Sequence, residues 1–454
     1  MASNSRAPNS SLARLLDEAR WRNGDLARAV NHLGRNAGLA LNYDDSAVSH
    51  WLAGTMPRRR ARSLVCEAFS RRLHRPITLY EAGLEPEERD DPAFTGRLRE
   101  PVWDADILTG LITLGGADMD PSRRAILTAG LYSAALAIPG WSDIQGRFAL
   151  AATNSQTTIG ATDVDAVRMM TDHLSSLDDQ FGGRTVRPMA AAFLVNTIAP
   201  LLQANASESV RRDLLSAAAD HCYLTGYMAM DERADQLAQR YYLKALQLAA
   251  AADDHLTYAT TLRGMSVMAV DLGHSTDALD LADGAWGASP EAGPRMKAFL
   301  AGQLAHAQAA NGHRRQALTH LREAETAMEK AESQTKALGS YDPASMNYHI
   351  AQVRYAIGEK AASISAMEQA DLLRDHIYRR ARVRHLGALA ERKLEIGHLE
   401  AACADWERML DDYPHVSSGR CDDRFNNMKQ ALGHHRKNPK ARQLLERATT
   451  MTRP

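Results

Sequence analysis

The sequence predicts an all-α protein, in which a small basic head is followed by a curved stack of helix pairs. Beyond residue 120, no run alternates polar and apolar residues as a half-buried strand does, and Asn-Gly or Asp-Gly hairpin turns are almost absent. Small residues instead recur at fixed offsets, most clearly over residues 219–415, as they do in helical repeats. The first 80 residues contain four segments with apolar residues at helical spacing.

The distribution of charge divides the chain into three parts. The first 80 residues hold 13 arginines and 6 acidic residues, whereas residues 81–120 hold 3 arginines and 11 acidic residues. A basic first domain suggests a polyanionic partner, and the acidic segment suggests a linker or a brake on non-specific binding. We therefore expect a head at 1–84, an acidic linker at 85–122 and a helical repeat domain at 123–454.

Three of the four head helices are defined by their apolar faces. They are expected at residues 11–22, 23–33 and 60–74, and Asn23 is the expected cap of the second. Together with the third helix they should form a core of Leu12, Leu15, Leu16, Ala19, Leu26, Ala27, Val30, Val48, Trp51, Leu52, Leu64, Val65, Ala68, Phe69 and Leu73.

The stretch SAVSHWLAGTMPRRRAR, residues 46–62, predicts the third helix and a basic segment behind it. Asp44 or Asp45 is the expected cap, and Gly54 ends the helix because glycine accepts a left-handed conformation. One interpretation is a helix that reads DNA, followed by residues that hold the DNA backbone. The other is an amphipathic helix followed by a solvated run of charges.

Together with DLARAV in the second helix, this stretch resembles the lambda-repressor-like helix-turn-helix of the Xre family. The shared features are Leu26-Ala27, Val48, Trp51, Gly54, Pro57 and a fourth apolar helix. The resemblance implies that the third helix enters the major groove of DNA, where short polar side chains bond base edges and the cations behind them contact phosphates. The implied DNA-binding residues are Asp45, Ser46, Ser49, His50, Arg58, Arg59 and Arg60.

One segment departs from that family. Its members join the second and third helices by a tight turn, whereas GRNAGLALNY, residues 34–43, intervenes in this chain. The insert could add contacts to DNA through Arg35, or it could be an inert loop.

Cysteine usage and the amino terminus predict a cytoplasmic protein. The four cysteines are far apart and form no CxxC pair, and the first residues contain no apolar segment of a signal peptide. Residues 122–141, SRRAILTAGLYSAALAIPGW, imitate an export signal with a twin arginine, but they lie inside the chain and are too short to span a bilayer. We expect a buried helix there, capped by Asp120-Pro121.

Four marks define the internal repeat, and the later three lie 7, 12 and 19 residues after the first. The first mark is Gly226, Ser266, Ala305, Ala351 and Ala390, and the second is Arg233, Gly273, Gly312, Gly358 and Gly397. The third is Ala238, Ala278, Ala317, Ser363 and Ala402, and the fourth is Ala245, Ala285, Ala324, Ala370 and Met409. All but two of these residues are Ala, Gly or Ser, which allows helix backbones to approach closely.

These offsets resemble the tetratricopeptide repeat, a helix, a turn and a second helix. The second mark, as in AANGHRRQA, is where the first helix of a pair should end. Residues 123–220 are expected to extend the helical layer less regularly, with one helix at 182–202, and NPKARQLLERATTM is expected to cap the stack. The predicted fold is thus a lambda-repressor-like head followed by a tetratricopeptide-like α-superhelix.

The combination of an Xre-type head with long repeats resembles a group of actinobacterial regulators. The segments LTGYMAMDERADQLAQRYYLKALQLA, residues 224–249, and RRAILTAGLYSAALAIPGW are similar to that group. Its better-known members are streptomycete repressors of differentiation, including sporulation, and of antibiotic biosynthesis. The resemblance implies a repressor of developmental or secondary-metabolite genes.

In tetratricopeptide arrays the first helix of each pair lines the concave face. Carrying the register over places aromatic and hydrogen-bonding side chains there, which suit a peptide or a small amphiphilic ligand. Packing residues with wet hydroxyls are the alternative. The candidate ligand-binding residues are Tyr223, Tyr227, Arg263, His306, Tyr348, Gln352, Tyr355 and Glu391.

The sequence as a whole favours a one-component transcription regulator that binds an operator in double-stranded DNA as a homodimer paired through its repeats. No P-loop, GxGxxG after a strand, HExxH or GxSxG occurs, so we expect neither an enzyme nor a bound cofactor or metal. The alternative function is a protein-interaction scaffold in which the helix-turn-helix is vestigial.

Overall fold

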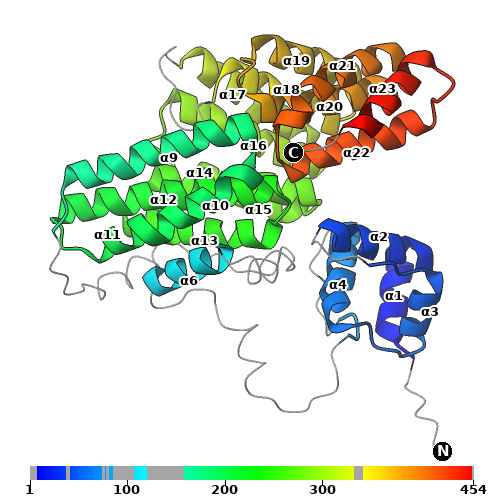
Figure 1. The fold of residues 1–454 in the computed structure, drawn as a ribbon, viewed down its shortest axis with the longest axis horizontal. Helices are drawn as coiled ribbons and strands as arrows, with labels where there is room; N and C mark the ends of the chain where they lie inside the picture. The colour runs from blue at the N-terminus through cyan, green and yellow to red at the C-terminus, as the bar shows by residue number, and fades with distance from the viewer. Residues whose placement is uncertain are drawn as a thin grey trace, which may run out of the picture.

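The computed structural model consists of a helical head and a larger helical body (Figure 1). It describes residues 8–36, 41–73, 77, 81–84, 107–119, 158–331 and 341–451. Within these ranges the regular structure is helical, apart from one isolated parallel bridge between Thr158 and Asn205. The prediction of an all-α fold with a superhelix of paired helices is therefore confirmed. The linker up to residue 106 and the helix expected at 122–141 lie outside the described residues.

Four helices form the head around one apolar core. They are α1 (Ser10–Glu18), α2 (Asn23–Asn36), α3 (Asp45–Leu52) and α4 (Arg59–Leu73). Every predicted core residue is buried except Leu52 and Leu73, which pack against the edge of the core. The apolar spacing along the chain was therefore sufficient to identify which side chains face inward.

The ends of α1 and α2 differ from the prediction. Arg20 has a positive φ of 52°, so α1 ends at Glu18 and does not continue to residue 22. The prediction of Asn23 as a helix cap was wrong, because Asp25 Oδ2 accepts a hydrogen bond from the Arg22 N–H at 2.8 Å and α2 begins with Asn23 inside it.

The insert between α2 and α3 begins as helix. α2 continues through Asn36, and the returning chain is held by Asn31, whose Nδ2 donates to Tyr43 O at 2.7 Å and whose Oδ1 accepts from the Tyr43 N–H at 2.8 Å. These two bonds fix the chain that leads into α3. Residues 37–40 and the Arg35 side chain lie outside the described residues.

The larger body begins with helices that the repeat register does not include. They are α6 (Ile107–Met119), α9 (Ala161–Phe181), α10 (Gly183–Phe193), the π-helical turn η1 (Leu194–Ile198) and α11 (Ala199–Gln203). α6 lies within the segment expected to be linker, but it packs on α10 and α13.

The helix pairs that carry the repeat marks follow along the chain. They are α12 (Glu208–Asp231) with α13 (Asp235–Ala251), α14 (His255–Leu272) with α15 (Ser275–Gly287), α16 (Pro294–Ala310) with α17 (Arg314–Glu329), α18 (Pro343–Ala356) with α19 (Lys360–Leu373), and α20 (Arg379–Glu395) with α21 (Leu399–Asp412). A 3-10 turn η2 (Tyr413–His415), α22 (Gly419–Gly433) and the predicted terminal helix α23 (Pro439–Thr450) complete the body.

The repeat marks lie at the helix ends and helix crossings that their spacing predicted. All five second-mark residues have φ between 66° and 87° and end the first helix of their pair. The first and third marks meet where the two helices cross: Ser266 Oγ donates to Ala278 O at 2.7 Å, and Ser363 Oγ donates to Ala351 O at 2.8 Å. Small residues at these crossings let each pair pack backbone against backbone.

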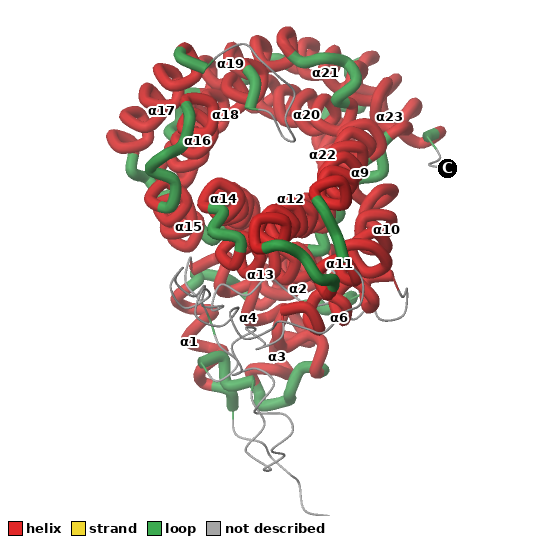
Figure 2. The backbone as a smooth tube through the Cα atoms, turned by 90° about the vertical axis from the view of Figure 1, so that its left-hand side faces the viewer, coloured by secondary structure: helices red, strands yellow, loops and turns green. Residues whose placement is uncertain are grey.

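The superhelix closes on itself into a ring, because α9 packs on α20 (Figure 2). We call the contact of residues 178–184 and 231–233 with residues 380 and 417–423 the seam. There the Ser417 N–H donates to Phe181 O at 2.7 Å, and the Arg184 N–H donates to Ser417 O at 3.2 Å.

Two glycines allow the chain to approach so closely at the seam. A Cβ on Gly182, whose φ is 87°, would lie 2.5 Å from Ser417 O. A Cβ on Gly419 would lie 2.7 Å from Glu232 O. Any larger residue at either position would push the two sides of the seam apart.

One apolar helical run has the length and composition of a membrane span among the described residues, from Gly183 to Gln203. It corresponds to the helix expected at 182–202. In the structure this run packs on α6, α9 and α12, and its Arg187 is buried between Asp118 and Glu232. These are the contacts of a core helix.

The head contacts the ring through α4. Glu67 Oε1 lies 3.1 Å from His274 Nε2 at the turn between α14 and α15, and it accepts a hydrogen bond from Arg71 Nε at 2.8 Å. His274 and Glu67 are both buried there. In Figures 1 and 2, α3 lies on the side of the head that points away from the ring.

Replacing Glu67 with alanine is expected to weaken docking of the head by about 1–3 kcal/mol, because Arg71 and His274 lose a shared, buried acceptor. Hydrogen–deuterium exchange of the whole protein should then become faster in α4 and at the α14–α15 turn. Asp17→Ala changes an exposed acidic residue on α1 and is the matched control. Unchanged exchange in both segments would show that this contact does not hold the head.

Candidate nucleic-acid interface and ligand-binding face

α3 is held rigidly in the head. Asp44 caps it, since its Oδ1 accepts the Ala47 N–H at 2.9 Å. Val48 and Trp51 are buried beneath it, and the Tyr43 ring packs edge-on against Trp51 with ring centroids 4.9 Å apart. Gly54, with φ of 97°, turns the chain away after the helix, as predicted.

The opposite face of α3 is exposed and polar. It carries the four predicted residues Asp45, Ser46, Ser49 and His50, all exposed to solvent. Ser49 is already engaged within the head, because its Oγ donates to Asp45 O and accepts from Asn23 Nδ2, both at 2.9 Å. The remaining side chains of this face present carboxylate, hydroxyl and imidazole groups to solvent.

Asn23 joins this face from α2, and the sequence-based prediction missed it. Asn23 was predicted to cap α2, whereas in the structure its side-chain amide donates to Ser49 of α3. An amide at this place can donate to or accept from a base edge, and it can donate to a phosphate. This contact depends on how α2 packs against α3 in space, so the spacing of residues along the chain could not predict it.

The predicted phosphate contacts lie at the start of α4. Arg58 is exposed just before the helix begins, and the side chains of Arg59 and Arg60 lie outside the described residues. Arg62 is turned inward, because its Nε donates to Pro57 O at 3.0 Å. Several further arginines of the head are exposed, namely Arg14, Arg20, Arg22, Arg28 and Arg72.

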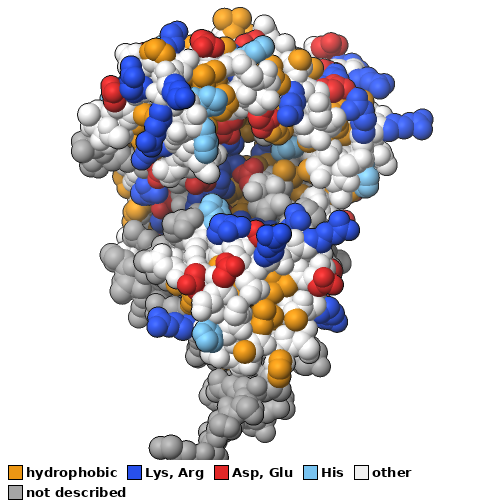
Figure 3. Space-filling view, turned by 90° about the vertical axis from the view of Figure 1, so that its right-hand side faces the viewer, with side chains coloured by type: hydrophobic (Ala, Val, Ile, Leu, Met, Phe, Trp, Pro, Cys, Tyr) orange, Lys and Arg blue, Asp and Glu red, His pale blue; other side chains and the backbone are white. Residues whose placement is uncertain are grey.

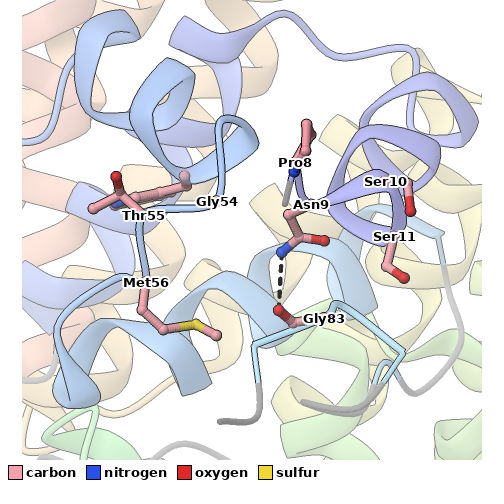
Figure 4. A pocket seen from close by; sticks show the side chains of 9 residues that line it. Pro8, Asn9, Ser10, Ser11, Gly54, Thr55, Met56 and Gly83 are labelled. Atoms are coloured by element: carbon pink, nitrogen blue, oxygen red, sulfur yellow. Dashed lines mark hydrogen bonds between the residues drawn. The ribbon is translucent and has the colours of Figure 1, made fainter. Parts of the chain in front are cut away.

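A small pocket of about 260 Å³ lies beside the end of α3 (Figure 4). Asn9 closes one side of it, because its Nδ2 donates to both Ala82 O and Gly83 O at 3.0 Å. The Asn9 N–H also donates to Leu52 O at 2.9 Å. Asn9 thereby ties the start of α1 to the end of α3 and to the chain behind α4, which supports the orientation of α3.

The second candidate site is the inner face of the ring. The first helices of the pairs line it, and the space-filling view shows a hollow with charged side chains of both signs and histidines at its wall (Figures 2 and 3). The eight predicted ligand-binding residues are spread along these helices, on α12, α14, α16, α18 and α20.

Three of these residues lie on α12 and α14. Tyr223 packs on Tyr242 at 5.8 Å between ring centroids, and burial raises the pKa of Tyr223. Burial alone would also raise the pKa of Tyr227, but Arg380 and two further arginines outweigh it and lower this pKa. Arg263 stacks on a phenylalanine ring at 4.1 Å and lies 3.0 Å from a histidine, and neither of these partners is acidic.

The other five residues make contacts between neighbouring helices. Burial, followed by two nearby arginines, lowers the pKa of His306 to about 4. Tyr348 is stacked on the α20 ring of His385, and Gln352 accepts from Arg392. Tyr355 Oη donates to Glu395 at 2.6 Å and Glu391 pairs with Arg424 at 2.5 Å.

Arginines of α20 and α22 are the main feature of the inner face that the sequence-based prediction missed. They include Arg380, Arg384, Arg392, Arg420 and Arg424. One of them lies at a fixed place in the repeat register, six residues before the first mark. Phe299, which stacks on Arg263, occupies that position on α16, and Arg384 occupies it on α20.

The head is similar to one known family, and the whole chain is similar in fold to a solved helical-repeat structure only at low identity. Residues 12–85 match a family model described as the SP15 N-terminal domain, so the match covers the head alone. No curated protein matches the chain. Among solved structures, a chain from the crystal structure of the APC/C hetero-tetramer Cut9-Hcn1 is 15% identical, with 92% of this chain and 68% of that chain covered and a TM-score of 0.32.

Proposed function

We propose that this protein is a sequence-specific DNA-binding transcription regulator, acting as a repressor, whose repeat ring mediates dimerisation and senses a peptide or small molecule. The observation that carries the proposal is the polar, exposed face of α3, mounted on a buried Val48 and Trp51 and turned away from the ring. A short helix presented in this way has the dimensions to enter a major groove.

The charge of the head supports the same proposal. Its 13 arginines and 6 acidic residues in the first 80 positions favour a polyanion, and its exposed arginines can neutralise phosphates. The resemblance to actinobacterial Xre-type regulators with tetratricopeptide-like repeats adds developmental and antibiotic-biosynthesis genes as the proposed targets, and the cytoplasm as the proposed location.

Because the head contacts the ring, a change of the ring on ligand binding can alter how the heads bind DNA. Two heads on one dimer would reach half-sites about 34–36 Å apart, or a multiple of that spacing. Because α4 rests on the α14–α15 turn through Glu67 and His274, a ligand that changes the ring would move the heads relative to one another.

Selection of genomic DNA fragments with the purified protein, followed by footprinting, tests this function. We expect a near-palindromic site and an affinity that falls steeply with salt, in proportion to the phosphates neutralised. A scaffold with a vestigial head would bind no duplex even at low salt, and that result would refute the regulator.

Substitutions within the head should separate base reading from phosphate binding. His50→Ala is expected to cost about 1–3 kcal/mol on the selected site and little on random DNA, because a base contact would be lost. Arg58→Ala should weaken both kinds of binding alike and reduce the salt slope by about one. Fluorescence anisotropy at several salt concentrations measures both effects. Equal losses on both DNAs for His50→Ala would contradict base reading by α3.

A further inference from the structure

Four arginines of the inner face contact no carboxylate among the residues that the structure describes. Arg263 bonds His349 and stacks on Phe299. Arg392 bonds only neutral groups, on α18 and α19. The other two are Arg384, which also lies on α20, and Arg374, which follows α19 and donates to Ser345 of α18 at 3.5 Å. Asp231 lies near Arg384 and Glu395 lies near Arg392, but no described carboxylate is within ion-pair distance of either guanidinium.

Arg384 has the fewest partners of the four. Within the described ranges, its guanidinium forms no hydrogen bond and no ion pair. The side chain is half-buried, and its ionisable neighbours are Tyr348, Tyr227, Asp231 and Arg380. Because Tyr227 and Tyr348 belong to the inner face, Arg384 lies at the hollow.

Next to Arg384 in the chain, His385 stacks on Tyr348, and we call these two rings the platform. The rings of Tyr348 and His385 are stacked, with centroids 4.1 Å apart and an interplanar angle of 12°. His385 is only 7% exposed, and its Nδ1 has no hydrogen-bond partner among the residues that the structure describes. A buried polar atom without a partner is costly unless water or a ligand satisfies it.

The platform lies in the field of several arginines. Burial lowers the pKa of His385 well below its usual value, and Arg374, Arg384, Arg392 and Arg424 lower it further. The imidazole is therefore neutral near pH 7, and the surrounding positive charge comes from guanidinium groups alone. Planar guanidinium forks match carboxylate and phosphate oxygens geometrically, and partial burial strengthens such pairs.

We infer that the hollow binds a small polyanion, whose phosphate or carboxylate group pairs with Arg384 beside the stacked Tyr348 and His385. This inference rests on the sensing role in the proposed function and gives the chemical class of its effector. Charge complementarity selects against neutral and cationic molecules, which would leave the arginines unpaired.

Calorimetric titration of the full-length protein with pyrophosphate, and separately with citrate, tests the inference. Sodium chloride keeps the ionic strength equal in every titration. We expect one or both anions to bind, and Arg384→Gln to weaken that binding at least tenfold, since a charge-assisted hydrogen bond is lost. Arg384→Lys, which keeps the charge but loses the fork, should weaken it less. Preference for pyrophosphate indicates a phosphate effector, and preference for citrate a carboxylate.

Two matched variants exclude other basic surfaces. Arg379→Gln alters a neighbouring arginine on α20, and Arg442→Gln alters an exposed arginine on α23; both should bind the anion as the unaltered protein does. If neither anion binds, or if Arg384→Gln and Arg384→Lys bind as tightly as the unaltered protein, the inference is wrong. No DNA is present, so a failure to bind operators would refute the proposed regulator without affecting this result.

Discussion

Replacing Arg380 with methionine is expected to lower the free energy of unfolding of the ring by about 3–5 kcal/mol, the usual effect of breaking a buried ion pair from one side. Arg380 is 4% exposed and crosses the seam from α20. Its guanidinium lies 2.9 Å from Asp178, 2.7 Å from Asp179 and 3.7 Å from Asp231. Without it, these carboxylates face one another with no cation between them.

The loss should depend on pH. Burial, with help from neighbouring acidic residues, raises the pKa of Asp178 to about 8, even though Arg380 opposes the rise. A folded-state pKa above the unfolded value of about 3.9 means that the folded protein binds the extra proton. The contribution of Asp178 to stability is therefore complete below about pH 4 and declines as the pH rises through about 8.

Arg380→Met removes the cation that opposes the rise, so the difference between variant and unaltered protein should widen with pH. Denaturant unfolding at pH 5 and pH 9 measures this difference. Arg379→Met, a neighbouring arginine of α20, is the control and should behave as the unaltered protein at both values. A loss below about 1 kcal/mol, equal at both pH values, would show that Arg380 does not hold the seam.

Replacing Arg187 with methionine is expected to cost a similar amount and to release α6. Arg187 is 1% exposed on α10, where it pairs with Asp118 of α6 and with Glu232 at 2.6 Å. Tyr241 Oη also donates to Asp118, at 2.9 Å. The substitution removes the cation that pairs with a fully buried carboxylate, a penalty of about 3–5 kcal/mol.

Release of α6 can be distinguished from general unfolding. Hydrogen–deuterium exchange should rise first in α6 and in the facing turns of α10, while α16 to α19, on another part of the ring, keep their protection. Arg184→Met removes a half-exposed arginine of the same helix, paired with Asp422 at 3.3 Å, and should change stability by less than about 1 kcal/mol. Uniform loss of protection throughout the ring would contradict a local role.

The features predicted correctly from the sequence are those that repeat locally. Leu12, Val48 and Phe69 are buried in the head because apolar spacing along a helix determines which face is covered. The second-mark residues were correctly placed at helix ends, even where Arg233 replaces glycine with φ of 66°. Each of these statements needs only neighbouring residues and the geometry of a helix.

The seam and the arginine wall could not be predicted in this way. Phe181 and Ser417 are far apart in the chain, and nothing periodic connects them, so closure depends on the accumulated curvature of every pair between them. Arg384 lies six residues before the first mark, whereas the predicted ligand-binding residues lie three before it, one after it and four after it, so the predicted set did not include Arg384. The prediction for Asn23 was wrong because an asparagine amide can cap its own helix or donate a hydrogen bond to a neighbouring helix, and the sequence does not distinguish the two.

The seam also has a consequence during synthesis. Ribosomes add about 5–20 residues per second, so about 20–70 s separate the appearance of residue 84 from that of residue 423. Until residue 380 is added, the head has all of its own sequence, while Asp178 and Asp231, once synthesised, still lack Arg380. A polypeptide that terminates early, before α20, would therefore carry a complete head on an open arc of helices, with its acidic edge available to other proteins in the cell.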